Sequence, residues 1–591
     1  MTNIEKLREY MRKEKIDAFI IPSNDPHFSE YVANYWKCRE WISGFTGSAG
    51  TVVVTNNKAA LWTDSRYFLQ AENQLKNSEV ELKKAGLKET ETIAEWLRKN
   101  IGEKSKTGID EKLFSIAEFE DLQKQLFPLK LIPVADPFVE IWENRPEMPK
   151  NKAFLLDITF CGKTTKEKLK DIEKALGETK NMVYIISALD EIAWLFNLRG
   201  SDIDYNPTAI AYALIDFPNL HLFIDTKKIS VYDKKTLKTN NVTIHEYEDF
   251  IKYTETVSDK KTVIINPKKN SVYIYNILKK NKLKTKIETN TNGIISSLKA
   301  IKNKTEILGF HRAMIADGVA LVKFFIWIDK NIGKTKITEL DVSAKLHEFR
   351  TKNKLFVGES FETISAYSEH GAIVHYEPTE ESNIEIKKQN FLLIDSGGQY
   401  YNGTTDVTRT IHLGKPTAAQ KLDYTLVLKG NIALSMAKFP KGARGAQIDA
   451  LARLPLWSAG KNYLHGTGHG VGHFLNVHEG PQSIRMNENP VTLEYGMITS
   501  NEPGIYVAGK YGIRIENLVL CKRYKTTAFG EFMQFETITL APIETKAINK
   551  KLLTTDEINW LNKYHETVYK KLSPQLNSQE RKWLKKKTQK I

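Results

Sequence analysis

Four of the chain's thirteen histidines lie in one short stretch, LHGTGHGVGHFLNVHEGP, at residues 464–481. They are separated by four, four and five residues, and a glycine stands beside nearly every one. Imidazoles bind metal ions and transfer protons, but a lone histidine is more often structural. The chemistry of this stretch therefore depends on which acidic side chains lie within reach of it.

Two other segments carry carboxylates in pairs. FLLIDSGGQYYNGTTDVTRTIHLG has the pattern of an antiparallel hairpin, which would bring Asp395 and Asp406 close together across the strands. MITSNEPGIYVAGKYGIRIENLVLC repeats this design, with Glu502 before a Pro-Gly turn and Glu516 expected in the middle of the following strand. The sequence therefore predicts two pairs of acids, each pair on one hairpin.

These acids would repel one another unless a cation lies between them, and aspartate is disfavoured inside strands. Four carboxylates and an imidazole can hold two divalent ions, and oxygen-rich ligation favours Mn²⁺, although Co²⁺, Fe²⁺ or Zn²⁺ can occupy such a site. Two ions ~3.5–4 Å apart share a water and lower its pKa, which produces a hydroxide that attacks a carbonyl. Alternatively, Asp395 caps a turn and the other acids are exposed; two matched pairs beside a histidine cluster favour the metal site.

The totals bound the class of protein. A chain of 591 residues is too long for one core and predicts about three or four domains. Three cysteines without a CxxC motif predict no disulfide framework and a reducing compartment. The charged N-terminal segment lacks the apolar run of a signal peptide, and no apolar run approaches the ~20 residues that span a bilayer. We therefore expect a cytoplasmic protein without a membrane partner.

The net charge of +15 is strongly basic, and residues 545–591 hold twelve Lys and Arg against four Asp and Glu. Such a tail binds nucleic acid in some proteins, but no aromatic–basic alternation or nucleic-acid module accompanies it. A solvated terminal helix is favoured, and no nucleic-acid partner is expected. The glycine-rich runs SGFTGSAGT and GTGHGVG fit neither the dinucleotide fingerprint nor the P-loop.

Two early segments follow the same plan of buried strand, aromatic helix and hairpin. The first contains DAFIIPSND, WISGF, TVVVT and AALWTD; the second contains MVYIIS, WLFNLRG, AIAYALID and LHLFID. Prolines and charges cluster between them in ENRPEMPKNK, and two consecutive helices begin near residue 300. We predict α/β domains at 1–148 and 149–298, followed by a catalytic domain at 299–591 that ends in the helical basic tail.

Ordered motifs over nearly the whole chain resemble the pita-bread metallopeptidases, and among them the aminopeptidase P family of the long, three-domain cytosolic type. They include SGFTGSAG and WTDSRYFLQA, then ALDEIAWLFNLRGSDI, and finally GAIVHYEP, LLIDSGGQY, GTTDVTRT, YLHGTGHGVG, FLNVHEGP, NEPGIY and GIRIEN. The resemblance implies two related creatinase-N-like α/β domains followed by a pita-bread catalytic domain, which is a duplicated α+β fold. It also implies a homodimer.

The resemblance also implies a role for particular residues. The family's five metal ligands fall on Asp395, Asp406, His469, Glu502 and Glu516. Glu502 corresponds to the candidate general base beside a metal-bridging hydroxide. These five positions would hold two Mn²⁺ ions, or Co²⁺, Fe²⁺ or Zn²⁺ in their place.

Further positions correspond to residues that contact substrate. His375 and His478 match histidines that touch the substrate and help to move protons, and His465 lines the substrate side. Arg66 in WTDSRY matches an arginine that approaches substrate from the first domain. Arg514 would support Glu516 from outside the ligand set.

Two positions depart from the family pattern. His473 stands where a small polar residue is common, and we expect it to make a neighbouring hydrogen bond and to bind no metal. Asn501 replaces a usual acid, which changes the charge beside Glu502 without removing a ligand. The glycines beside the histidines are expected to let the backbone bend closely around the ions.

The implied activity is hydrolysis of the bond between an N-terminal residue and proline, with proline-containing peptides as substrates. A prolidase, which cleaves only Xaa-Pro dipeptides, is the nearest rival; methionine aminopeptidase shares the ligands but lacks two preceding domains. The alternative from another class is a non-catalytic pita-bread binding module. Such modules lack ligands, whereas all five positions are filled here.

Overall fold

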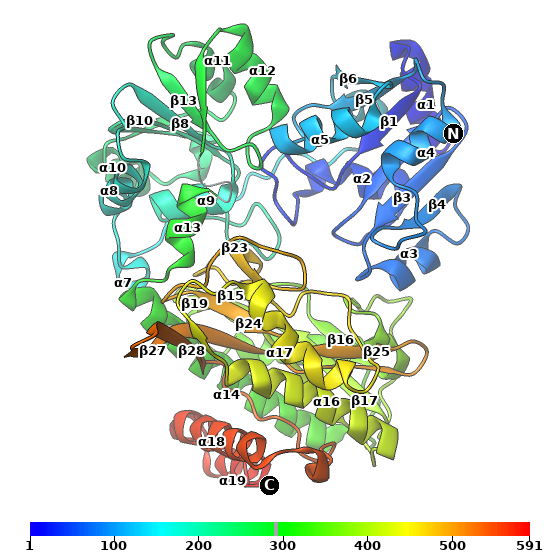
Figure 1. Ribbon diagram of the computed structural model, residues 1–591, viewed down its shortest axis with the longest axis vertical. Helices are drawn as coiled ribbons and strands as arrows, with labels where there is room; N and C mark the ends of the chain where they lie inside the picture. The colour runs from blue at the N-terminus through cyan, green and yellow to red at the C-terminus, as the bar shows by residue number, and fades with distance from the viewer. Residues whose placement is uncertain (289–292) are drawn as a thin grey trace. The chain divides into compact units, whose positions relative to one another are not determined.

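Two six-stranded sheets with the same strand order form the first half of the chain (Figure 1). The computed structural model describes residues 1–288 and 293–591. These residues divide into two compact units: Met1–Leu156 with Lys163–Ile295, and Asp157–Gly162 with Ser296–Ile591. Both six-stranded sheets belong to the first unit.

The first sheet has the order β4-β3-β2-β1-β5-β6 and the second the order β12-β11-β10-β8-β13-β14. The strands of the first are β1 (Ala18–Ile21), β2 (Thr51–Thr55), β3 (Ala59–Thr63), β4 (Val80–Lys84), β5 (Lys106–Asp110) and β6 (Lys130–Val134). The strands of the second are β8 (Met182–Ile186), β10 (Tyr212–Asp216), β11 (Asn219–Phe223), β12 (Val242–His245), β13 (Thr262–Ile265) and β14 (Lys284–Ile287).

The predicted duplication is confirmed by the pairing of the strands. In the first sheet β2 lies antiparallel between β1 and β3, and in the second sheet β10 lies antiparallel between β8 and β11. All the other neighbouring strands in both sheets are parallel. Because β1 and β8 lie inside their sheets, every residue of β1 and nearly all of β8 is buried, as their apolar runs predicted.

Helices cover these two sheets, and each helix with a capping box begins where the sequence supplies a Ser or Thr followed three residues later by Glu, as at Ser115 and Thr164. The helices are α1 (Asn3–Glu14), α2 (Cys38–Ser43), α3 (Phe68–Gln74), α4 (Ile93–Asn100), α5 (Ile116–Leu126), α6 (Phe138–Ile141), α8 (Thr165–Leu176), α9 (Leu189–Phe196), α10 (Val231–Thr239), α11 (Asp249–Glu255) and α12 (Val272–Lys280). A short pair, β7 (Phe154–Leu155) and β9 (Leu198–Arg199), completes the unit.

The second unit packs long helices against several small sheets and one six-stranded sheet of order β21-β28-β27-β24-β22-β23. Its helices are α7 (Ile158–Cys161), α14 (Lys304–Asn331), α15 (Glu339–Arg350), α16 (Ala418–Ser435), α17 (Gly445–Trp457), α18 (Thr555–Leu572) and α19 (Ser578–Lys587); α13 (Ile294–Ala300) leads into it. The two helices expected near residue 300 are α13 and α14.

Apart from β27 and β28, the strands of this unit are short, and consecutive strands often belong to different sheets. They are β15 (Phe356–Glu359), β16 (Ile364–Tyr367), β17 (Phe391–Ser396), β18 (Gly398–Tyr400), β19 (Gly403–Thr404), β20 (Val407–His412), β21 (Lys438–Pro440), β22 (Gly468–Gly470), β23 (Glu479–Ile484), β24 (Ile498–Asn501), β25 (Gly504–Val507), β26 (Tyr511–Arg514), β27 (Asn517–Thr527) and β28 (Gly530–Thr537).

Two of the acidic residues lie where the chain changes sheet, which corrects the simple hairpins that we expected. Asp406 lies between β19 and β20, and Glu516 lies between β26 and β27 instead of in mid-strand. Asp395 pairs with Thr408 and does not directly face Asp406. The main-chain N–H of Glu516 donates to the main-chain oxygen of Thr408 at 3.1 Å, which links the segment between β26 and β27 to β20.

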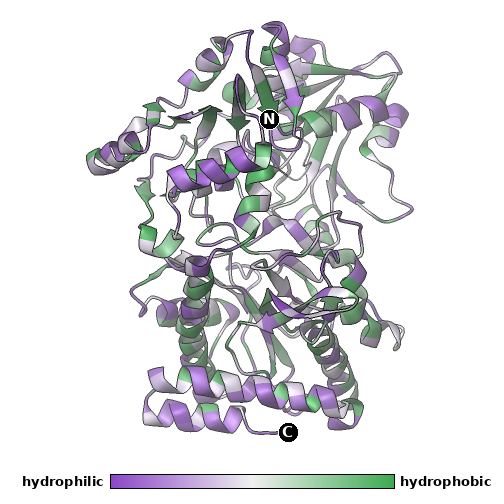
Figure 2. Ribbon diagram, turned by 60° about the vertical axis from the view of Figure 1, so that its left-hand side comes forward, coloured by the Kyte–Doolittle hydropathy of each residue, from purple (hydrophilic) through white to green (hydrophobic). Residues whose placement is uncertain are grey.

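The basic tail forms α18 and α19, which are largely hydrophilic in Figure 2. One face of these helices is apolar and packs toward α14, with Leu572 and Leu584 fully buried. Trp583 donates to Asp329 of α14 at 2.9 Å.

Among the described residues, no helix is both long and apolar enough to cross a membrane. The exact domain limits at 148 and 298 stay predictions.

Candidate metal centre

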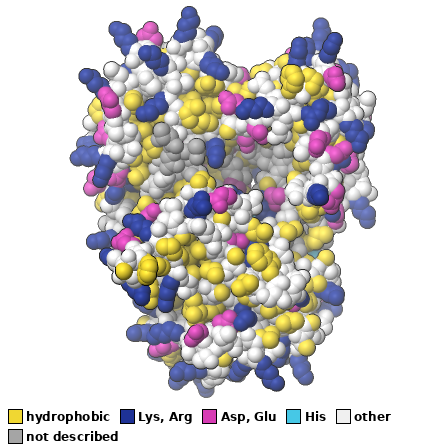
Figure 3. Space-filling view, in the orientation of Figure 1, with side chains coloured by type: hydrophobic (Ala, Val, Ile, Leu, Met, Phe, Trp, Pro, Cys, Tyr) yellow, Lys and Arg dark blue, Asp and Glu magenta, His cyan; other side chains and the backbone are white. Residues whose placement is uncertain are grey.

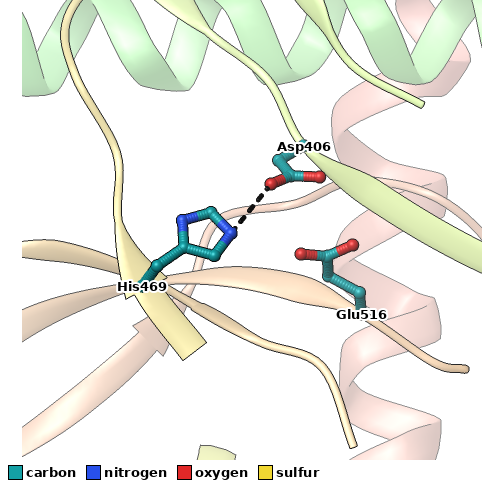
Figure 4. Close-up of side chains that lie close together, drawn as sticks. All are labelled: Asp406, His469 and Glu516. Carbon is teal, nitrogen blue, oxygen red and sulfur yellow. Dashed lines mark ion pairs between the residues drawn. The ribbon is translucent and has the colours of Figure 1, made fainter. Parts of the chain in front are cut away.

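Three of the predicted ligands meet in the second unit, although they come from three separate segments (Figure 4). One ligand atom from each of Asp406, His469 and Glu516 lies within 4.8 Å of the others. The imidazole Nε2 of His469 is 3.4 Å from an oxygen of Asp406. Asp406 and Glu516 are buried, so the two carboxylates are withdrawn from the water that would otherwise solvate them.

The remaining two predicted ligands lie beside this cluster. An oxygen of Glu502 is 3.5 Å from the same Nε2 of His469. Asp395 is buried at the end of β17 and adds its charge to those acting on Glu516. The structure therefore brings the five predicted positions to one place.

Burial and the mutual repulsion of the carboxylates dominate the electrostatics of the cluster. Burial and the charges of neighbouring carboxylates hold the pKa of Glu516 well above its usual range. Burial also raises the pKa of Glu502 to about 7, although His469 opposes this shift. Burial alone would lower the pKa of His469, but Asp406 and Glu502 raise it to about 9. A group of this kind takes up either protons or cations.

Two buried carboxylate oxygens support a cation in this place. Oδ1 of Asp395 and Oε1 of Glu516 accept no hydrogen bond from any residue that the structure describes. Buried acceptors are normally satisfied, so two such oxygens in one cluster favour a bound cation there. Carboxylates with one imidazole form a donor set suited to hard or borderline divalent ions.

Arg514 contacts Asp395, whereas we expected it to support Glu516. Its guanidinium donates to Oδ2 of Asp395 at 2.6 Å through Nη2 and at 3.2 Å through Nε. Within the described part of the chain, it is linked to Glu516 through Thr408, whose hydroxyl donates to Oε2 of Glu516 at 2.7 Å. The reason is the sheet change at residue 515, which turns the side chains of positions 514 and 516 to different neighbours.

Further polar side chains orient the cluster and were not identified from the sequence. The hydroxyl of Ser500 donates to Glu502 at 3.1 Å and accepts from the main chain of His469 at 3.0 Å. The hydroxyl of Tyr506 lies 2.7 Å from Arg514 and 2.8 Å from Nε2 of His465. Their only sequence signal is proximity to Glu502 in the motif SNEPGIY.

The other predicted histidines lie in different surroundings. His478 is half-buried, and its ring stands edge-on to that of His469 with centroids 4.4 Å apart. His375 is half-buried just after the short helix at 368–372. His473 is buried and lies 3.0 Å from the oxygen of Asn402, which is the hydrogen bond that we expected.

The glycines of GTGHGVG allow close packing, which differs from the expected bending around ions. None of Gly468, Gly470 and Gly472 has a positive φ. A Cβ at Gly468 would lie 2.0 Å from the oxygen of Ser500, and one at Gly470 would lie 2.2 Å from the oxygen of Glu479. These glycines therefore let neighbouring strands approach β22 on both sides.

Asn501 and Arg66 each make hydrogen bonds to residues outside the predicted ligand set. The amide of Asn501 donates to the oxygen of Asn431 at 2.8 Å and to Ser435 at 2.9 Å, so its side chain faces α16 instead of Glu502. Arg66 lies in the first unit, where its guanidinium donates to both oxygens of Asp64 at 2.9 and 2.8 Å. Its role toward substrate stays a prediction.

Family profiles match most of the chain. Residues 309–523 match metallopeptidase family M24, and residues 531–591 match the C-terminal region of peptidase M24. The creatinase/prolidase N-terminal domain is matched twice, at residues 3–141 and 144–306. Fold and site together define a metal-dependent peptidase with two creatinase-type domains before its catalytic domain.

Individual relatives are similar over nearly their whole length. Xaa-Pro aminopeptidase 1 of Dictyostelium discoideum is 43% identical, with 98% of this chain and 95% of the relative covered. The crystal structure of X-prolyl aminopeptidase from Caenorhabditis elegans, described as a cytosolic enzyme with a di-nuclear active site, has a TM-score of 0.95 and 35% identity, with 100% and 99% covered. A prolidase from Pyrococcus horikoshii shares the fold alone, at 23% identity, a TM-score of 0.50 and 64% and 99% coverage. The chain belongs to the Xaa-Pro aminopeptidases of metallopeptidase family M24.

Proposed function

We propose that this protein releases the N-terminal residue from peptides that carry proline in second position. The observation that carries the proposal is the buried cluster of Asp406, His469 and Glu516 in a chain similar, end to end, to enzymes named Xaa-Pro aminopeptidases. Hydrolysis at proline needs no N–H on the scissile bond, but the leaving nitrogen must receive a proton.

The proposed cofactor is a pair of Mn²⁺ ions, with Co²⁺, Zn²⁺ or Fe²⁺ as the alternatives. The ligands would be Asp395, Asp406, His469, Glu502 and Glu516, and the unsatisfied oxygens of Asp395 and Glu516 support this assignment. Such ions, when bound, polarise a carbonyl and lower the pKa of water.

The protein's own side chains would handle the protons. Glu502 is the proposed general base, because it is held by Ser500 at the edge of the cluster. His478 is the proposed donor to the proline nitrogen, since its half-exposed ring lies directly against His469. We propose that His375, His465 and Arg66 contact the substrate, and that Arg514 holds Asp395 in place.

A peptide assay distinguishes this function from its nearest rival. With Mn²⁺, the protein is expected to release the first residue from an Xaa-Pro-Yaa tripeptide. The matched peptides are the Xaa-Pro dipeptide, an Xaa-Ala-Yaa tripeptide and an N-acetylated Xaa-Pro-Yaa peptide, all of which should be cleaved far more slowly. Cleavage of the dipeptide alone would identify a prolidase, and cleavage of none would support the non-catalytic binding module.

We also propose a cytoplasmic homodimer. Large apolar side chains gather over α16 and α17 in Figure 3, and those exposed on or near these helices are Leu422, Leu451, Leu454, Trp457 and Leu464. Exposed apolar patches of this kind mark protein interfaces. No partner of another class, nucleic acid included, is proposed.

A charge in this patch is expected to dissociate the dimer. Leu454, which is 58% exposed, would be replaced by glutamate, because an unpaired charge in an apolar interface is costly to bury. Light scattering should then report the mass of a monomer. Phe529→Glu is the matched control, since Phe529 is 91% exposed on the turn between β27 and β28 and should leave the dimer intact. An unaltered dimer in Leu454→Glu contradicts the proposed interface.

A further inference from the structure

A buried ion cluster lies next to the histidine segment and is separate from the five proposed ligands. The carboxylate of Glu479 lies 2.7 Å from Nζ of Lys299 and 2.8 Å from Nζ of Lys302. All three side chains are 1% exposed. Two buried ammonium groups share one carboxylate here, which is an unfavourable arrangement unless good geometry compensates for the lost hydration.

Glu479, which carries the carboxylate of this cluster, directly follows His478 in the chain. It begins β23 and pairs with Gly470, which directly follows His469. A Cβ at Gly472 would lie 2.6 Å from Oε2 of Glu479. Glu479 therefore occupies the space left by Gly470 and Gly472, and the chain between His469 and Glu479 folds back around it.

The lysines are themselves fixed by the chain that leads into α14. Lys299 lies in the last turn of α13, and Nζ of Lys302 also donates to its main-chain oxygen at 3.0 Å. The main chain of Lys302 donates to the oxygen of Gly496 at 3.0 Å. The next residue, Asn303, caps α14. These contacts hold the main chain of both lysines beside Glu479.

We propose that Lys299 and Lys302 are positioning residues for the hydrolysis, which they serve by fixing Glu479 and, through it, His478 against His469. This inference rests on the proposed function. The lysines act on neither substrate nor metal directly. By holding Glu479, which pairs with Gly470, the lysines set the distance between the imidazole rings of His478 and His469.

The test uses single substitutions, because one remaining lysine keeps Glu479 paired and the protein folded. In Lys299→Met and Lys302→Met, kcat for the Xaa-Pro-Yaa tripeptide is expected to fall about 10-fold or more, as when groups supporting a metal site are lost. KM should change less than about threefold, since ground-state binding is retained. Lys299→Arg should recover most of the lost kcat, because it restores the cation.

Lys429→Met is the matched control. Lys429 also pairs with a glutamate, Glu557, at 2.6 Å, but it joins α16 to α18 away from the histidine segment. Its kcat should stay within about twofold of the wild type, as expected for a change without effect on the transition state.

A measurement without substrate separates this inference from the proposed function. Hydrogen exchange of residues 470–484 should quicken in Lys299→Met and stay unchanged in Lys429→Met, with divalent metal content equal in both. Unchanged kcat in both lysine variants, or a fall in kcat without faster exchange in this segment, overturns the positioning role. A wild-type protein that cleaves no Xaa-Pro peptide overturns the proposed function, while the exchange data still report whether the lysines hold the segment.

Discussion

Asp406→Ala is expected to lower kcat/KM for an Xaa-Pro-Yaa peptide by about a thousandfold or more, since a metal site supplies several kcal/mol of transition-state stabilisation. The protein should stay folded. Asp406 is one of several buried acids that repel one another, and it raises the pKa of Glu516 and Glu502. Without metal, its removal should therefore leave thermal stability equal or higher.

Asp423→Ala provides the opposite result as a control. Asp423 is also a buried aspartate of the second unit, but it pairs with Lys461 at 2.5 Å and accepts from Tyr511 at 3.0 Å. Its removal should lower the melting temperature, because Lys461 is left without its counter-charge. The metal content should stay intact, because Asp423 is not one of the proposed ligands. Elemental analysis, calorimetry and peptide assays would check both variants. An active Asp406→Ala enzyme with full metal content would refute the ligand assignment.

Removal of divalent ions is expected to abolish activity, and Mn²⁺ should restore it. Ions that bind only the folded protein stabilise it, so the chelated protein should also melt at a lower temperature. The tripeptide assay before and after dialysis against chelator, followed by titration with Mn²⁺, measures the effect. A fully active sample that elemental analysis shows to be free of divalent ions contradicts the metal-dependent mechanism.

The stability lost on metal removal should grow as the pH rises. Burial raises the pKa of Glu502 to about 7 in the metal-free protein, from a usual 4.5. A raised folded-state pKa adds stability below the unfolded value, and this stability is lost as the pH rises from about 4.5 through about 7. Unfolding of the metal-free and Mn²⁺-loaded protein at pH 5 and pH 7.5 should show the gap widening.

The duplicated sheets and the four candidate acidic ligands could be predicted from the amino-acid sequence. Both follow from local patterns: β1 and β8 are short apolar runs. Asp395, Asp406, Glu502 and Glu516 stand out because they come in two pairs beside apolar, β-branched segments, where acids are uncommon. The expected hydrogen bond of His473 was correct in kind, although its partner Asn402 lies 71 residues away.

The contacts that hold those residues in place could not be predicted from the sequence. The sheet changes at Asp406 and Glu516, the contact of Arg514 with Asp395, and the turning of Asn501 to α16 all depend on which strands and helices become neighbours. The pairing of Lys302 with Glu479 spans 177 residues and leaves no periodic trace in the sequence. Periodicity reports the face on which a side chain lies, whereas its partner across the fold is chosen by the packing of distant segments.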